Sequence, residues 1–194
     1  MKGLKKVAKF VLFKLLFRVQ VIGKENISEN ERFVFAPNHS SSMDGVWMWC
    51  EIPNVAIMAK KELFKFKPLG WFLKKVGVFP ISRGEKDVKS IYHAVNVLRD
   101  DTNRSLLIFP EGTRNAQKKN VRAKTGAVYI AKAAKKQIIP VYITENKHFF
   151  RKCYIVIGKP YNLVDESDNN KDKSVLRKET DILIEKIYSL KEKI

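Results

Sequence analysis

The stretch that decides the fold is Phe33-Val34-Phe35-Ala36-Pro37-Asn38-His39-Ser40-Ser41-Ser42-Met43-Asp44-Gly45. Its first four residues are apolar and typical of a buried strand, which the Pro-Asn pair then ends. The serines form a loop, and the apolar run after Gly45 predicts a helix over about 44–51. A histidine therefore follows a strand directly, and a carboxylate opens the next helix, where it is well placed as a cap.

His39 and Asp44 have the residue types and spacing of a catalytic pair. Imidazoles titrate near neutrality, so His39 could accept a proton from an alcohol, while Asp44 on the other ring nitrogen would fix the tautomer and ring orientation. This is a Ser-His-Asp triad without its nucleophile, which would then come from a substrate. The alternative is that the pair only caps a turn. Neither His93 nor His148 has a carboxylate at that spacing.

The composition indicates one folded domain with an anionic partner. The chain has 194 residues, 45% of them hydrophobic, and a formal net charge of +18. Such a charge favours nucleic acid or an anionic membrane surface as the partner. Cys50 and Cys153 form no C-x-x-C motif and fit buried, reduced thiols of a cytosolic setting.

Residues 1–18 predict an amphipathic helix that associates with a membrane surface. Its apolar run is too short and too interrupted by lysines to span a bilayer, which takes about 20 apolar residues, and no small-residue cleavage site follows it. One arc of the helix carries Lys2, Lys5, Lys6 and Lys9, and the other carries Leu4, Val7, Phe10, Val11 and Leu15. We expect an interfacial anchor on anionic lipid, followed by a single domain over 19–194. The alternative is a helix docked on the protein's own core.

The rest of the chain alternates strands with helices, which indicates an α/β fold with a mixed, largely parallel sheet flanked by helices. Strands are expected at 19–22, 33–35, 55–58, 77–81, 106–109, 138–143 and 154–157. Helices are expected at 44–51, 69–76, 88–98, 126–134 and 173–192. Pro80 places its strand at an edge or at a strand end. Trp47, Trp49, Trp71 and Phe72 are expected in the core.

Three further loops deliver a cation just past a strand, where the loops of such folds converge. The cations are Lys60, Arg83 and Arg114. Arginine grips phosphate with two donors, and lysine acts as a point charge. Gly112, just before Arg114, allows a tight turn and a close approach of its backbone to a ligand. For any one of these loops the alternative is a surface salt bridge.

These residues resemble the motifs of the glycerolipid acyltransferase family. Asn38-His39 with Asp44 matches its N-H-x-x-x-x-D motif, and Phe79 to Arg83 resembles its second motif. Phe109 to Arg114 reads F-P-E-G-T-R, the third motif, and Lys124-Thr125-Gly126 resembles the K-x-G that follows it. The resemblance covers roughly residues 33–158 and points to the bacterial 1-acyl-sn-glycerol-3-phosphate acyltransferases.

The resemblance implies transfer of an acyl chain from acyl-CoA or acyl carrier protein to the sn-2 hydroxyl of lysophosphatidic acid, giving phosphatidic acid. His39 would be the base and Asp44 would hold its ring. Lys60 and Arg114, supported by Arg83, would bind the acceptor phosphate. Glu111 and Gly112 would shape the glycerol site, and Lys124 would act on phosphate or on structure. No metal or cofactor is implied, and the protein would be peripheral at the cytoplasmic face of the cell membrane.

Other functions remain open from the sequence. Another lysolipid acceptor would use the same chemistry. A basic nucleic-acid-binding protein is supported by the net charge alone, because no zinc finger, basic-region zipper or clear RNP or KH signature is present. A serine hydrolase lacks its G-x-S-x-G motif.

Overall fold

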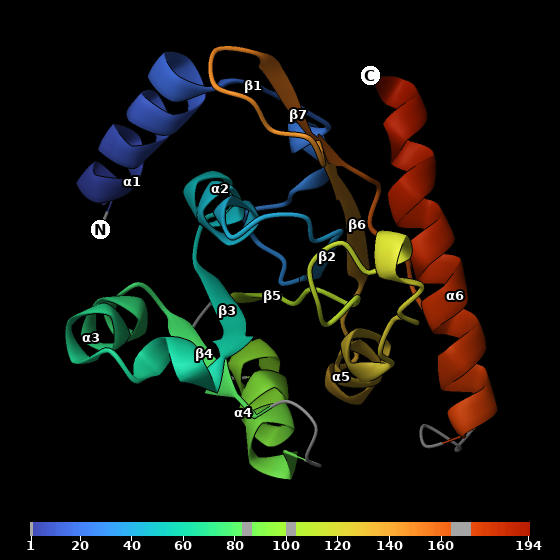
Figure 1. Cartoon of the computed structure of the whole chain (residues 1–194). Helices are drawn as coiled ribbons and strands as arrows, with labels where there is room; N and C mark the ends of the chain where they lie inside the picture. The colour runs from blue at the N-terminus through green and yellow to red at the C-terminus, as the bar shows by residue number, and fades with distance from the viewer. Residues whose placement is uncertain (1, 83–86, 100–103, 164–171) are drawn as a thin grey trace.

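The computed structural model describes residues 2–82, 87–99, 104–163 and 172–194. Its strands form one seven-stranded sheet in the order β1-β7-β6-β2-β5-β3-β4. They are β1 (Arg18–Ile22), β2 (Val34–Pro37), β3 (Val55–Lys60), β4 (Val78–Ile81), β5 (Ser105–Leu107), β6 (Ile138–Ile143) and β7 (Lys152–Ile157). Neighbouring strands are parallel except β6 and β7, which are antiparallel. The expected mixed, largely parallel sheet is confirmed (Figure 1).

Helices cover both faces of this sheet. One face carries α1 (Lys2–Lys9), its π-helical continuation η1 (Phe10–Leu16), α2 (Met43–Glu51), and the pair η3 (Lys61–Phe64) and α3 (Lys67–Lys75). The other carries α4 (Val88–Arg99), α5 (Gly126–Ala134) and α6 (Lys173–Ser189). The alternation of side chains along β2 explains the layers, because Phe35 packs with the first group while Val34 and Ala36 pack with the second.

The topology brings the loops that follow β2, β3, β5 and β6 to one edge of the sheet. Strand β2 lies between β6 and β5, and β3 follows β5, all of them parallel. The loops that leave their carboxyl ends therefore meet at the same edge, where ligands bind in open α/β sheets. Strand β4, which contains Pro80, is an edge strand as expected.

Some boundaries and one group of core residues differ from expectation. The first helical segment ends at Leu16, because Arg18 already pairs with β7. The last helix ends at Ser189 and continues as a 3-10 turn, η5 (Leu190–Lys193). Trp47 and Trp49 are buried, but the expectation was wrong for Trp71 and Phe72, which are 65% and 42% exposed. Short α3 packs on the core through Leu73, which leaves its aromatic side chains outside.

The lysine arc of the N-terminal helix is partly turned towards the protein. Lys5 Nζ donates to the Ile52 carbonyl at 2.8 Å, and Lys9 Nζ lies 2.5 Å from the Glu51 carboxylate. These two lysines therefore face the protein. The exposed side chains are mainly apolar, namely Leu4, Val7, Phe10, Val11 and Leu15. Within the described residues, every helix is too short or too polar to cross a bilayer.

Candidate active site

His39 and Asp44 meet where β2 runs into α2. His39 Nδ1 lies 3.0 Å from Asp44 Oδ2, and the carboxylate is fully buried while the imidazole is 13% exposed. A carboxylate acceptor requires the proton on Nδ1, which leaves the lone pair on Nε2. No described residue hydrogen-bonds to Nε2, so this nitrogen is open to a substrate hydroxyl.

Three further contacts hold His39, one to its ring and two to its backbone. The Phe109 ring stacks on it with centroids 4.0 Å apart. The His39 carbonyl accepts from the Asn115 N–H at 2.7 Å, and the His39 N–H donates to Glu111 at 3.4 Å. Thus the loop after β5 fixes the position of the loop after β2, although the two are about 70 residues apart in sequence.

Asn38 anchors the same loop to the neighbouring strand. Its side-chain amide donates to the Ile143 carbonyl at 3.0 Å, and its side-chain oxygen accepts from the Ile143 N–H at 2.7 Å. Asn38 is buried, so these two bonds satisfy groups that water does not reach. The asparagine of the motif thereby joins the end of β2 to the end of β6 by two hydrogen bonds.

Asp44 is stabilised as a carboxylate despite its burial. Oδ2 accepts from the His39 ring and from the Ser40 and Ser41 N–H groups, both at 2.7 Å, and Oδ1 lies 2.7 Å from Lys147 Nζ. Burial acts to raise the pKa of Asp44, but the hydrogen bond from His39, the charge and hydrogen bond of Lys147 and the Ser41 N–H together outweigh it. The pKa of Asp44 therefore lies below its ordinary value.

Glu111 is buried beneath the site and bonds only to protein groups. It accepts from the Tyr188 hydroxyl at 2.8 Å and from the Ala116 N–H at 3.3 Å, besides the His39 N–H. Burial raises its pKa above the ordinary value, although these hydrogen bonds oppose the shift. Glu111 thus connects the loop after β2, its own loop after β5 and helix α6 through hydrogen bonds.

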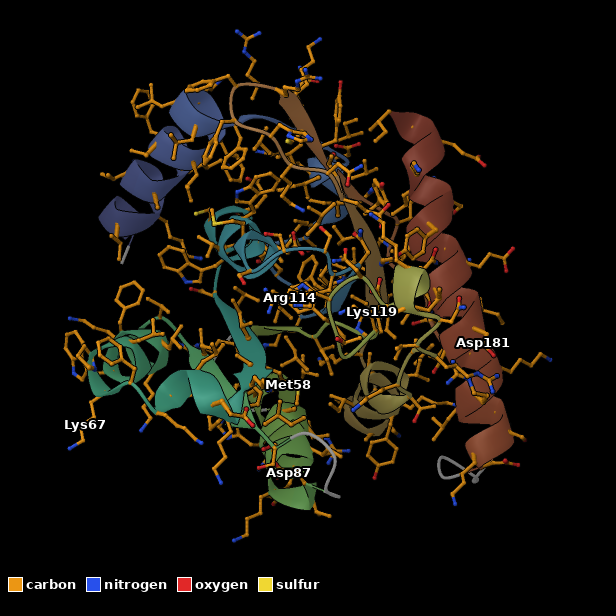
Figure 2. All side chains as sticks on the ribbon, in the orientation of Figure 1. Met58, Lys67, Asp87, Arg114, Lys119 and Asp181 are labelled. Carbon is orange, nitrogen blue, oxygen red and sulfur yellow. The ribbon has the colours of Figure 1, made fainter. Side chains whose placement is uncertain are left out.

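Of the predicted phosphate-binding cations, Arg114 contacts the His39 loop, whereas Lys60 pairs with a neighbouring residue. Arg114 Nη1 donates to Ser42 Oγ at 3.0 Å, which sets this exposed guanidinium against the His39 loop. Figure 2 labels Arg114 close to the α2 ribbon, whereas Lys67 of α3 lies at the outer edge. Lys60, at the end of β3, is half-exposed and pairs with Glu62 at 3.8 Å. Arg83 lies outside the described residues.

Gly112 and Lys124 are packed on each other. Gly112 has a φ of +65°, a left-handed conformation that favours glycine, and a Cβ there would come within 3.0 Å of the Lys124 side chain. The Lys124 N–H donates to the Pro110 carbonyl at 2.8 Å. Lys124 therefore supports the turn that presents Arg114, while the residue itself stays exposed.

The three loop serines are all engaged by protein donors. Ser40 Oγ accepts from Lys147 at 2.7 Å, Ser41 Oγ from the Met43 N–H at 3.2 Å, and Ser42 Oγ from Arg114. None of them bonds to the His39 ring, which fits a nucleophile that comes with the substrate. Among the described residues, no group of three metal-ligating side chains is close enough together to hold an ion.

Sequence reasoning missed two residues that contact the pair or its support. Lys147, in the loop between β6 and β7, reaches Asp44, and Tyr188, on α6, reaches Glu111. Lys147 does follow an apolar strand, which is the signal that singled out the other loops, but loop lysines are usually exposed. Tyr188 carries no such signal, because it lies within the apolar pattern of a helix.

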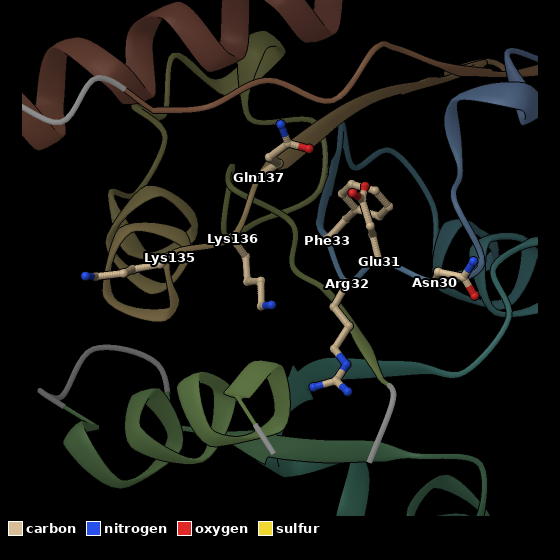
Figure 3. A pocket seen from close by; sticks show the side chains of 7 residues that line it. All are labelled: Asn30, Glu31, Arg32, Phe33, Lys135, Lys136 and Gln137. Carbon is tan, nitrogen blue, oxygen red and sulfur yellow. The ribbon is translucent and has the colours of Figure 1, made fainter. Parts of the chain in front are cut away.

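A cavity of about 360 Å³ lies elsewhere, lined by Asn30, Glu31, Arg32, Phe33, Lys135, Lys136 and Gln137 (Figure 3). These residues precede β2 and β6, so the cavity is at the amino ends of the strands. His39 follows β2 and is therefore at the opposite edge of the sheet. The cavity is separate from the candidate site.

Comparison with known proteins identifies a family and several relatives of this chain. The family described as "Acyltransferase" matches residues 18–144. The chain is 33% identical over 191 residues to the 1-acyl-sn-glycerol-3-phosphate acyltransferase of Bacillus subtilis, a match that covers 95% of this chain and 94% of that protein. A protein of the same name from Streptococcus pneumoniae is 37% identical over 119 residues, covering 60% of this chain and 43% of that protein.

The fold is similar to a solved structure. The crystal structure of the 1-acyl-sn-glycerophosphate acyltransferase from Thermotoga maritima matches with a TM-score of 0.67 and 24% identity. The match covers 98% of this chain and 78% of that one. The resemblance drawn from the motifs is confirmed by the family match and the sequence relatives.

Proposed function

This chain belongs to the acyltransferase family, and we propose that it transfers an acyl chain from a thioester to the sn-2 hydroxyl of 1-acyl-glycerol-3-phosphate, giving phosphatidic acid. The observation that carries the proposal is the His39–Asp44 pair, with its 3.0 Å contact and its open Nε2. The near full-length match to a protein named for this reaction supports the choice of acceptor.

The proposed reaction is a direct transfer without an acyl-enzyme. His39 Nε2 removes the proton of the sn-2 hydroxyl while that oxygen attacks the thioester carbonyl carbon. The tetrahedral intermediate collapses with cleavage of the C–S bond, and the thiolate leaves with the proton returned by the imidazolium. Asp44 holds the ring in the correct tautomer and stabilises its charged form. The engaged loop serines support this role of the substrate as the nucleophile.

Cations around the site would bind the acceptor phosphate. Arg114 contacts the His39 loop, Lys60 ends β3, and Lys124 supports the turn before Arg114. We assign Arg114 and Lys60 to the phosphate, with Arg83 in support, and Glu111 and Gly112 to the shape of the glycerol site. The donor would be acyl-CoA or acyl carrier protein, and the proposed reaction needs no metal or other cofactor.

We also propose that the protein lies on an anionic membrane surface at the cytoplasmic face, through the apolar face of α1 and η1. We call this the α1 face; it consists of Leu4, Val7, Phe10, Val11 and Leu15. The exposed Phe149 and Phe150 extend it, because Phe149 stacks on Phe17 and the Phe150 N–H donates to Leu16. Exposed Lys6 and Lys14 lie beside these side chains. Aromatic and basic residues on one exposed helix are typical of interfacial anchors.

A second patch of the same kind supports this orientation. The η3–α3 segment exposes Phe66, Trp71 and Phe72 among several lysines, and Lys75 Nζ lies 4.8 Å from the Trp71 ring centroid. Both this segment and α1 pack on the same face of the sheet (Figure 1). A flat lipid surface could therefore contact both.

The test is a reconstituted transfer assay with purified protein. A panel of lysolipids is offered with acyl-CoA and with acyl carrier protein thioesters, and products are identified by mass spectrometry. Lysophosphatidic acid should be acylated, and His39→Ala should lower turnover by about 10²–10⁴-fold, the usual cost of losing a positioned base. Near-normal turnover of His39→Ala would rule out the proposed mechanism. If a different lysolipid is acylated in place of lysophosphatidic acid, the proposed acceptor is wrong, although the proposed chemistry stands.

A nucleic-acid-binding function rests on the net charge alone. Salt-sensitive binding to duplex DNA without any acyl transfer would support it.

A further inference from the structure

Lys147 is an unusual lysine, because it is buried although it lies in a loop. Its side chain is only 6% exposed and stands over the Trp47 ring, with Nζ 5.4 Å from the ring centroid. Lysine is seldom buried unless its ammonium group has partners. Here the partners are Asp44 Oδ1 at 2.7 Å, Ser40 Oγ at 2.7 Å and the Thr144 carbonyl at 2.5 Å.

The Lys147 side chain, only 6% exposed, is engaged by the protein and presents little surface to a substrate. Two of its three N–H donors bond to Ser40 Oγ and the Thr144 carbonyl, and its charge pairs with Asp44 Oδ1. A role in binding the acceptor phosphate is therefore disfavoured. Its charged partner is the carboxylate that also binds the His39 ring, so Lys147 would act on the reaction through Asp44.

The two carboxylate oxygens of Asp44 have different partners. Oδ2 faces His39 and two backbone N–H groups, and Oδ1 faces Lys147. A buried carboxylate next to an imidazole attracts a proton to the pair, since an unpaired buried charge is costly. A cation on the far oxygen balances that charge without a proton.

We propose that Lys147 is a positioning residue that keeps Asp44 ionised and the His39 ring neutral before substrate binds, so that Nε2 is free to accept the hydroxyl proton. This inference rests on the proposed function of His39. Within the described part of the chain, the other charged or titratable groups that contact the His39 loop or its support are Glu111 and Arg114, from the loop after β5, and Tyr188, which bonds to Glu111 from α6.

The test is the titration of the His39 ring by NMR, in protein labelled on its histidines. The chain has three histidines, so the His39 signal is assigned by its absence in His39→Ala. Lys147→Met removes the charge, and Lys147→Gln removes the charge but keeps polar groups. In both, the midpoint of the His39 titration should rise by about one pH unit, as expected when a nearby cation is lost. In Lys147→Arg and in the exposed control Lys152→Met, the midpoint of the His39 titration should stay close to that of the unmodified protein.

The same variants give a second readout in kcat/KM against pH. A raised midpoint moves the acid limb to higher pH, so the Lys147→Met rate on that limb should fall about tenfold for each pH unit by which the midpoint rises. At high pH the rates should converge. A rate lowered equally at every pH, or an unmoved His39 midpoint, would overturn the proposal. So would a failure of both uncharged variants to fold while Lys147→Arg folds, since Lys147 would then be structural. The titration needs no turnover, so an inactive protein would count against the proposed function and not against this inference.

Discussion

At the residue scale, Arg114 separates phosphate recognition from catalysis. It contacts the His39 loop through Ser42 and has no contact with Asp44 among the described residues. If it binds the acceptor phosphate, Arg114→Ala loses a charge-assisted hydrogen bond worth about 1.5–3 kcal/mol. We expect kcat/KM for lysophosphatidic acid to fall roughly 10- to 100-fold, mainly through KM, with the KM for the thioester little changed.

Three controls sharpen this measurement. Arg114→Lys keeps the charge but not the two-pronged geometry, and should recover only part of the loss. Arg122→Ala removes the same net charge at the α6 surface, where Arg122 pairs with Asp181 at 3.0 Å, and should leave KM unchanged (Figure 2 labels Asp181). With monoacylglycerol as acceptor, Arg114→Ala and the unmodified protein should be nearly equal. An equal penalty on both acceptors would make Arg114 structural.

At the element scale, Asp87 caps α4 at its N-terminus. Its carboxylate accepts from the Ser90 N–H at 3.0 Å, the Ser90 hydroxyl at 2.7 Å and the Ser82 N–H at 2.8 Å, and these bonds, led by that of Ser82, lower its pKa to about 2. Asp87→Ala should therefore lower the free energy of unfolding at pH 7 by about 0.5–2 kcal/mol, measured by urea denaturation. Because the folded pKa is below the unfolded value, this contribution is present above about pH 4 and disappears as the pH falls towards 2. Asp87→Asn keeps a hydrogen-bond acceptor without the charge, so its free energy of unfolding at pH 7 should fall by less than that of Asp87→Ala. Equal stability of Asp87→Ala and the unmodified protein would contradict the capping role.

At the scale of the whole molecule, the α1 face should dominate membrane binding. Replacing Val7 and Phe10 with Gln should weaken binding to anionic vesicles at least about tenfold in a flotation assay, since a fully buried apolar side chain contributes about 1.5–3 kcal/mol. Val88 is exposed to a similar degree on α4, on the opposite face of the sheet, so Val88→Gln is the matched control. Lys6→Gln with Lys14→Gln should have a smaller effect that disappears in 1 M salt, where the Debye length is about 3 Å. Flotation of the Val7 and Phe10 variant at the unmodified level would place the anchor elsewhere.

The sequence by itself determined the layers, the family and the His39–Asp44 pair. These depend on local periodicity and on residues that share one strand–loop–helix unit, so short-range patterns suffice to find them. The tertiary structure alone decided that Lys147 balances Asp44, that Tyr188 reaches Glu111, and that Lys5 and Lys9 face inward. Such contacts join segments that are far apart in the chain, and they arise from strand order and helix packing, which no local pattern specifies. The buried Lys147 illustrates the reason: a loop lysine is expected in water, and only the fold supplies the carboxylate, hydroxyl and carbonyl that let it leave water.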